Sequence, residues 1–178
     1  RRMQLKLIKA THALIAEGGV GAVTFRAVAQ IAEVSPGSVS YHFTDKNDLL
    51  RAATEYSKER FNQRAEAALG KVSEGHDLGA CLADLVEQIT VHNRTEIEVD
   101  YDLYLASFNE PELRPLAAVW SHEMGNIIAR YTTPKRAELL LYALEGMILH
   151  AAKFGRMFFA DQALQLFALV GKENGRMP

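Results

Sequence analysis

Residues 33–43 read EVSPGSVSYHF and contain a short helix with an unusual start. Ser35 can cap the first free amides of this helix, and Pro36 suits its first position because the missing N–H would be unpaired there. Gly37 is unexpected, since glycine inside a helix costs about 1 kcal/mol relative to alanine. Helix stability does not explain Gly37, so we expect another molecule to approach the backbone closely at this point.

A second short helix precedes this one. Thr24 can cap a helix that extends to about Ala32, and residues 32–34 form a tight turn. Two short helices joined in this way form a helix-turn-helix, whose second helix enters the major groove of DNA with its N-terminal residues first. Gly37 then lacks a side chain where the helix must approach the duplex.

Polar side chains on and after the second helix suit contacts to DNA. Short hydroxyls that can reach phosphates or base edges are present at Ser35, Ser38 and Ser40. Tyr41 and His42 can donate to backbone oxygens, and the next helix begins with a positive charge at Lys46. Taken alone, the motif could equally be a simple turn followed by the edge of a core.

Apolar residues repeat at helical spacing along almost the whole chain. The expected helices cover residues 3–17, 24–32, 36–43, 45–69, 77–92, 95–109, 113–131, 135–154 and 160–171. Gly70 is expected to end the helix of residues 45–69. Residues 96–105 also alternate as a strand does, but no second strand is present for pairing. We therefore predict an all-α fold.

Residues 8–50 resemble the DNA-binding head of the tetracycline-repressor (TetR) family. The resemblance rests on residues 24–29 (TFRAVA) and 34–43 (VSPGSVSYHF), followed by Lys46 and Leu49. It implies a homodimer whose subunits each have a three-helix head, a connecting fourth helix and a larger ligand-binding body. The DNA contacts that it implies, with Ser40 added for its hydroxyl, are Thr24, Arg26, Ser35, Pro36, Gly37, Ser38, Ser40, Tyr41, His42 and Lys46.

Two positions depart from the family pattern. Glu33 occupies the turn position that usually holds glycine, where a left-handed backbone would cost a side chain about 1 kcal/mol. Ser40 replaces the first residue of the usual aromatic pair, so a weaker hydroxyl stands where a tyrosine would contact phosphate. Both departures bear on the affinity for operator DNA.

We expect a helix-turn-helix domain at residues 1–50, a linker helix at about 45–69, and a ligand-binding and dimerisation domain at 71–178. In the body, residues 137–152 and 163–170 are apolar nearly all round, so they must be covered on every side. We predict that they form an isologous four-helix dimer interface; a monomer that uses both helices as core is the alternative. The predicted interface residues are Leu139, Tyr142, Ala143, Gly146, Leu166, Phe167 and Val170.

Aromatic and methionine side chains in the body could line a mostly apolar ligand cavity. The predicted ligand-binding residues are Tyr101, Tyr104, Phe108, Trp120, Met124, Met147 and His150. An acidic set could attract a cationic ligand or could simply be a solvated face: Glu96, Glu98, Asp100 and Asp102.

Composition limits the classes of function. Residues 1–60 carry nine Lys and Arg against six Asp and Glu, which suits a polyanion-binding head on a more acidic body. The single cysteine, Cys81, excludes an internal disulfide and is expected in the core. No apolar run is long enough to span a bilayer and no signal peptide opens the chain, so we expect a cytoplasmic protein without membrane contact. Because the chain starts Arg1-Arg2-Met3, residues upstream are expected to be missing.

These features predict a ligand-responsive transcriptional regulator, in the simplest form a repressor. A small, largely apolar molecule would shift the linker helix and release double-stranded operator DNA. A TetR-like dimer that binds a protein instead of DNA stays open as an alternative. An enzyme with an acid or base among Asp100, Asp102, His122 and Glu145 is remote, because no catalytic motif is present, and neither a metal nor a cofactor is expected.

Overall fold

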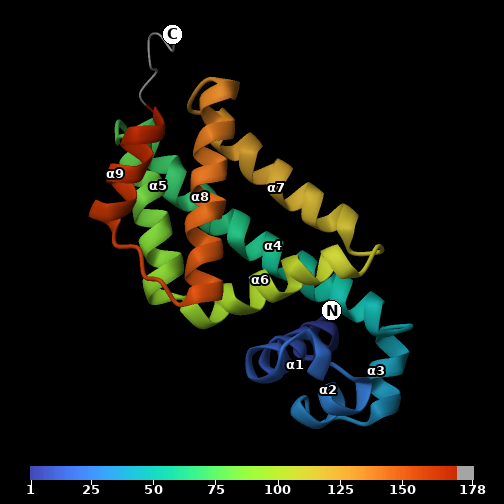
Figure 1. The fold of residues 1–178 in the computed structure, drawn as a ribbon. Coiled ribbons are helices and arrows are strands. Elements are labelled where there is room, and N and C mark those ends of the chain that lie inside the picture. Colours follow the sequence, from blue (N-terminus) through green and yellow to red (C-terminus); the bar gives the residue numbers. More distant parts are fainter. Residues whose placement is uncertain (172–178) are drawn as a thin grey trace. The chain divides into compact units, whose positions relative to one another are not determined.

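The computed structural model describes residues 1–171, which fold into α-helices without any strand (Figure 1). The predicted all-α fold is confirmed. The α-helices are α1 Arg2–Gly18, α2 Phe25–Ile31, α3 Pro36–His42, α4 Lys46–Gly70, α5 Leu78–Glu87, α6 Arg94–Asn109, α7 Arg114–Ala129, α8 Pro134–Phe154 and α9 Ala160–Gly171. Shorter helices are Val20–Ala22, Lys71–Glu74 and the π-helix Gln88–His92. The last seven residues of the predicted body, 172–178, lie outside the described residues.

Side-chain caps begin the two short helices as the sequence predicts. Thr24 Oγ1 accepts a hydrogen bond from the amide of Ala27 at 3.1 Å, and Ser35 Oγ accepts one from the amide of Ser38 at 3.3 Å. Each cap satisfies an amide that has no carbonyl partner in the first turn. In each helix, the first turn is therefore fixed by a hydrogen bond between the capping side chain and the amide three residues later.

Helix α4 begins and ends close to the predicted residues, but its last residues continue into a 3₁₀ turn. Asp45 Oδ1 accepts from the amide of Asp48 at 2.8 Å, which caps the first turn. Gly70 was expected to end the helix, and α4 does end there, but Gly70 itself keeps helical angles of φ −54° and ψ −30°. The chain tightens into a 3₁₀ turn, and Gly75, at φ 96°, is the left-handed residue that ends it.

Residues 94–109 form a helix in spite of their alternating pattern. Val99, Leu103 and Ser107 are buried, and they recur every four residues, which is the period of one helix face. No partner strand exists among residues 1–171, so backbone hydrogen bonds within a helix are the available way to satisfy the segment's amides.

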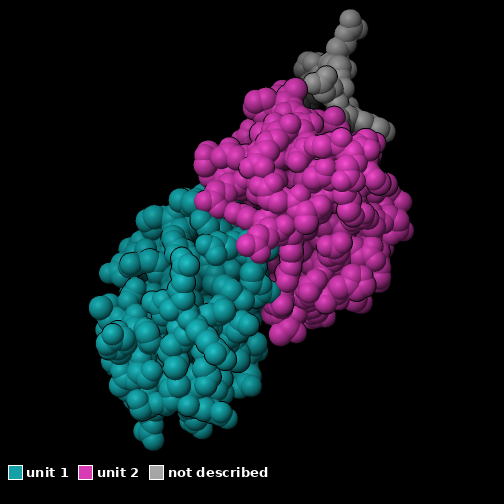
Figure 2. Space-filling view, turned by 180° about the vertical axis from the view of Figure 1, so that it is seen from behind, with its two compact units in different colours: residues 1–60, 98–120 teal, residues 61–97, 121–178 magenta. Residues whose placement is uncertain are grey.

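The described chain divides into two compact units, which Figure 2 shows in different colours. Unit 1 comprises residues 1–60 and 98–120, and unit 2 comprises the described part of 61–97 and 121–178. The core of unit 1 joins residues of the head, such as Leu7 and Phe43, to Leu103 and Leu113. Residues 98–120 thus pack with the head, whereas the sequence division near residue 71 assigned them to the body.

Unit 2 is built around α5, α8 and α9. The side chains of Leu82, Leu85, Ile148 and Phe167 are almost fully buried in it. Cys81 is 3% exposed, so its predicted core position is confirmed, and burial raises the pKa of its thiol. In residues 1–171 no helix combines the length and the apolar character that crossing a membrane requires.

Candidate nucleic-acid interface and effector site

The predicted DNA contacts gather on α2, α3 and the start of α4. The buried side chains of Val28, Val39 and Phe43 hold the two short helices in the core of unit 1. Seven of the ten predicted contacts are exposed: Thr24, Arg26, Ser35, Pro36, Gly37, Ser40 and Tyr41. The other three are partly buried: Ser38, His42 and Lys46. All ten therefore retain surface that a duplex can contact, and their roles stay a prediction.

The exposed hydroxyls of Thr24, Ser35 and Ser40 differ in whether their hydrogen is free to donate to DNA. Thr24 and Ser35 use only their lone pairs as helix caps, so both O–H groups can donate to a phosphate. Ser40 Oγ donates to the carbonyl of Pro36 at 3.4 Å. In this conformation the hydroxyl hydrogen is used within the helix. Ser40 is therefore a poorer hydrogen-bond donor to a phosphate than an exposed tyrosine would be.

Two large side chains project from this surface. Tyr41 is 85% exposed, and its ring meets His42 edge-on at 5.1 Å between centroids. A tyrosine this exposed gains little from the protein's own packing. Arg26 is exposed and forms no ion pair with any described residue, so its charge is available to a phosphate or a base.

Gly37 has no steric role within the chain. A Cβ placed there would meet only Ser35 Oγ, at 3.9 Å, and the position does not need a left-handed backbone. The cost of glycine in a helix therefore has no compensation inside the described chain. This fits the expectation that another molecule approaches α3 at Gly37.

The turn between α2 and α3 is left-handed at Glu33, as the sequence predicts. Glu33 has a φ of 50°, and among residues 1–171 no other non-glycine residue has a positive φ. The amide of Val34 donates to the carbonyl of Ala29 at 2.9 Å, and the amide of Glu33 donates to Gln30 at 3.1 Å. These hydrogen bonds stabilise the turn, and the turn sets the direction in which α3 leaves α2.

The seven predicted ligand-binding residues do not line one described cavity. Four of them form an aromatic cluster in unit 1, where Tyr104 lies 5.7 Å from Tyr101, 5.9 Å from Phe108 and 6.2 Å from Trp120 between ring centroids. The other three belong to unit 2: Met124, Met147 and His150. Met124 and Met147 are both buried, and Met147 together with His150 also lines a groove on α8 and α9.

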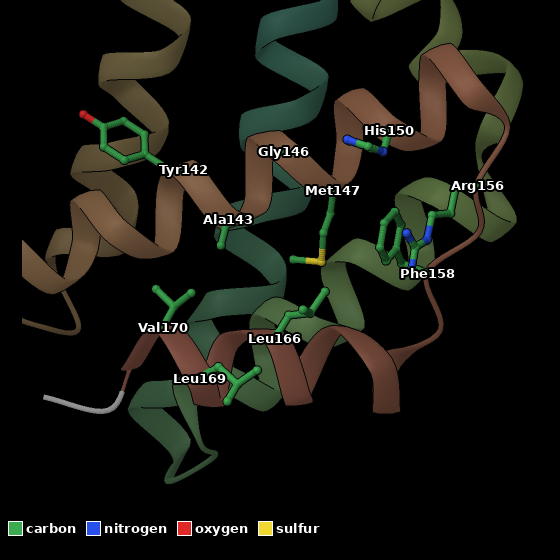
Figure 3. Close-up of a pocket in the computed structure, with 10 residues that line it drawn as sticks. All are labelled: Tyr142, Ala143, Gly146, Met147, His150, Arg156, Phe158, Leu166, Leu169 and Val170. Atoms are coloured by element: carbon green, nitrogen blue, oxygen red, sulfur yellow. The ribbon is translucent and has the colours of Figure 1, made fainter. Parts of the chain in front are cut away.

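This groove has a volume of about 500 Å³, and Figure 3 shows Ala143, Met147 and Leu166 directed into the space between α8 and α9. It is lined by Tyr142, Ala143, Gly146, Met147, His150, Arg156, Phe158, Leu166, Leu169 and Val170. Five of these belong to the predicted dimer interface. The sequence analysis missed Leu169, which is 68% exposed and lies one turn after Leu166 on the same face of α9.

Phe167 was predicted at the dimer interface, but it is only 2% exposed in the single chain. It lies one turn after the buried Ala163, on a different face of α9 from Leu166 and Leu169. Phe167 therefore belongs to the core of unit 2 rather than to the exposed surface of α9.

The acidic set of α6 is not a uniform solvated face. Asp100 is 2% exposed, and Glu96 pairs with Arg64 of α4. Burial, and next to it the negative charge of Glu98, raise the pKa of the Asp102 carboxyl. These carboxylates are thus partly buried or paired, and they differ in environment from one another.

Two further polar pairs lie partly buried in unit 2. Asn62 Nδ2 of α4 donates to Glu123 Oε2 of α7 at 2.6 Å, and Ser121 Oγ of α7 donates to Glu145 Oε1 of α8 at 2.7 Å. Asn62 and Glu123 were not identified from the sequence, where an isolated Asn and Glu 61 positions apart give no signal.

Comparisons with known proteins bear on both units. Residues 7–53 match the sequence model of the bacterial regulatory proteins of the tetR family, and residues 73–170 match that of the tetracyclin repressor-like C-terminal domain. The chain belongs to the TetR family. The regulator BetI of Pseudomonas fluorescens is 27% identical over 177 residues, which cover 93% of this chain and 88% of BetI.

Solved structures of TetR-like proteins agree with this assignment. The multidrug binding protein EbrR in complex with ethidium is 31% identical, covers 94% of this chain and 98% of its own, and superimposes with a TM-score of 0.83. A TetR family member from Streptomyces coelicolor is 29% identical with a TM-score of 0.87, over 96% of this chain and 98% of its own. This TetR-family protein is a ligand-responsive, DNA-binding transcriptional regulator, and a protein-binding role in place of DNA binding is not favoured.

Proposed function

We propose that this TetR-family regulator is a cytoplasmic, non-catalytic repressor that binds its operator as a homodimer. A small, largely apolar effector that enters the body releases it from DNA. The observation that carries the DNA-binding part is Gly37, an exposed glycine at the start of α3 for which the described chain offers no structural reason. The proposed contacts are Gly37 and the nine other predicted residues on or next to α2, α3 and α4.

The exposed faces of α8 and α9 support the homodimer. Large apolar side chains remain accessible there at Leu139 (43%), Tyr142 (58%) and Leu169 (68%). An apolar patch that solvent contacts is typical of a protein interface. Two such faces related by a twofold axis would form a four-helix interface and hold two copies of α3 for half-sites about 34–36 Å apart.

The relatives support a small effector with aromatic character. EbrR has been solved in complex with ethidium, proflavin and malachite green. Helix α4 is continuous over Lys46–Gly70 and has residues in both units, so a ligand that displaces its second half acts on the helix that follows α3. Operator and effector then weaken each other's binding by the same coupling free energy, which is typically about 1–3 kcal/mol.

Replacing Gly37 by alanine tests the DNA-binding surface. Gly37→Ala should raise the free energy of unfolding by up to about 1 kcal/mol, because alanine favours the helix. The same variant should bind operator at least about tenfold more weakly, because the methyl group keeps the duplex from the backbone; tenfold corresponds to about 1.4 kcal/mol. Operator fragments selected from genomic DNA are titrated by fluorescence anisotropy, and unfolding is followed in urea.

Gly70→Ala is the matched control. Gly70 is a helical glycine of α4 whose added Cβ would meet nothing within 4 Å, and it lies outside the proposed DNA surface. It should gain stability without any change in operator affinity. Equal operator binding by Gly37→Ala and wild type would count against α3 as the element that reads DNA.

A further inference from the structure

We propose that Thr90 and Glu87 are positioning residues for the homodimer: they hold α9 in the orientation that presents its apolar side chains to a second subunit. This inference rests on the proposed function, because it explains how one subunit prepares the proposed dimer surface. Glu87 is the last residue of α5, and Thr90 lies in the π-helix that follows. Neither is among the predicted interface residues, so both would act through α9.

Thr90 binds the N–H and the C=O of one residue, Phe158, with a single hydroxyl. Thr90 Oγ1 donates to the carbonyl oxygen of Phe158 and accepts from the amide of Phe158, each at 3.2 Å. Thr90 is fully buried and Phe158 is 3% exposed, so water does not compete for these bonds. Residues 155–159 connect α8 to α9 without regular structure, and a side chain therefore supplies the partners that a helix would otherwise provide.

Glu87 fixes the next part of the chain, which is the start of α9. Glu87 Oε2 accepts a hydrogen bond from the amide of Ala160, the first residue of α9, at 2.7 Å. A carboxylate at this end satisfies an amide that has no partner within the helix and interacts favourably with the helix dipole. Because Glu87 and Thr90 are three residues apart, both can face the same connection.

The connection that these two residues hold forms one end of the groove on α8 and α9. Arg156 and Phe158 line this end, and the guanidinium carbon of Arg156 lies 4.7 Å from the centre of the Phe158 ring (Figure 3). Leu166 and Leu169 line the same groove from α9. Since α9 is continuous from Ala160 to Gly171, a shift of its start moves both leucines relative to α8.

Thr90→Val tests the hydroxyl, because valine keeps the shape of the side chain and removes both hydrogen bonds. The N–H and C=O of Phe158 must then turn toward water, since buried peptide groups are rarely left unsatisfied. We expect the dimer dissociation constant to rise about tenfold or more, because two buried polar groups lose their partner. Sedimentation equilibrium measures the constant. Thr90→Ser keeps the hydroxyl and should restore dimerisation.

Glu87→Met is the second variant, and it carries the test if Thr90→Val does not fold. It removes the acceptor for the amide of Ala160 and should weaken dimerisation in the same direction. Glu87→Gln is its conservative partner. The amide oxygen of glutamine can still accept from Ala160, so this variant should retain most of the dimer affinity.

Asp77→Ala is the matched control for a general loss of stability. Asp77 Oδ1 accepts from the amide of Ala80 at 2.9 Å and caps the other end of α5. Loss of this cap should lower the urea midpoint but leave the dimer constant of the folded protein unchanged. Hydrogen exchange reports on the contact itself: the amide of Phe158 should exchange faster in Thr90→Val and at the wild-type rate in Asp77→Ala.

Unchanged dimerisation of Thr90→Val and Glu87→Met, with a dimeric wild type, rejects this inference alone. Equal weakening by Asp77→Ala also rejects it, because dimerisation would then follow overall stability. A Thr90→Ser variant as weak as Thr90→Val would assign the effect to packing and not to the hydroxyl, which overturns the inference as well. A wild type that stays monomeric rejects the homodimer of the proposed function, and this inference with it.

Discussion

Glu33 shows how a single residue can oppose the conformation that the fold requires. Its φ of 50° lies in the left-handed region, where a side chain meets its own backbone. The turn is retained because the bonds from Glu33 to Gln30 and from Val34 to Ala29 tie the residues before α3 to the end of α2. The fold therefore keeps strain at the residue that sets the direction of α3.

Substitution of Glu33 should relieve this strain. Glu33→Gly is expected to raise the free energy of unfolding by about 1 kcal/mol, because glycine adopts the left-handed region without cost. Urea unfolding followed by circular dichroism measures the change. Glu33→Gln removes the same charge but keeps the Cβ, and it should leave the stability unchanged; a gain of the same size in both variants would show that charge, not backbone conformation, is responsible.

At the scale of elements, α6 takes its position from packing rather than from its sequence pattern. Val99 and Leu103 complete the core that α1 to α4 leave open, so the middle of α6 belongs to unit 1. The same placement of α6 also positions the carboxylate of Asp102. Its carboxylate lies 3.6 Å from where a Cβ on Gly19 would stand, in the turn after α1.

The raised pKa of Asp102 predicts a pH-dependent stability. Burial first, and then the charge of Glu98, disfavour the ionised carboxylate in the folded chain. Since the folded state holds the proton more tightly than the unfolded state, ionisation reduces stability as pH rises through the ordinary range of aspartate and up to the raised pKa. Asp102→Asn should therefore raise the melting temperature at pH 7 and have little effect below about pH 3.

Thermal unfolding at the two pH values checks this expectation. Asp84→Asn on α5 is the control, because Asp84 is exposed and its substitution should show no such difference between pH 3 and pH 7. The explanation by burial fails if Asp102→Asn shifts the melting temperature equally at both pH values.

At the scale of the whole molecule, the groove between α8 and α9 is the feature that a second subunit would complete. Gly146 lies in the middle of α8, and a Cβ added to it would meet nothing within 4 Å. As with Gly37, the single chain gives no reason for glycine at this position. The reason we propose is the close approach of the partner's helix.

Gly146→Ala should therefore have opposite effects on the subunit and on the dimer. The helix propensity of alanine should stabilise the isolated subunit by about 0.5–1 kcal/mol. The added methyl group should weaken dimerisation about tenfold or more, because overpacking of an interface costs about 1–3 kcal/mol. Sedimentation equilibrium gives the dimer constant, with Gly70→Ala as the variant that should leave it unaltered.

Unchanged dimerisation of Gly146→Ala would place the interface elsewhere on the chain. A wild type that stays monomeric at high concentration would remove the dimer from the proposed function. DNA binding by α3 is measured separately through Gly37→Ala.

The sequence by itself determined the features that depend on residues a few positions apart. The caps at Thr24 and Ser35, the left-handed turn at Glu33 and the helical state of almost every segment follow from local hydrogen bonds and helical spacing. Local sequence was enough for the helix-turn-helix because its geometry is built from neighbouring residues.

The tertiary structure decided what depends on residues distant in the chain. Only packing shows that residues 98–120 belong with the head, that Phe167 is buried while Leu169 is exposed, and that Asn62 meets Glu123. A pattern of apolar residues tells that a helix has a buried face, but it does not tell which helix covers that face. For the same physical reason the bonds between Thr90 and Phe158 have no signature in the sequence: they join residues that are 68 positions apart.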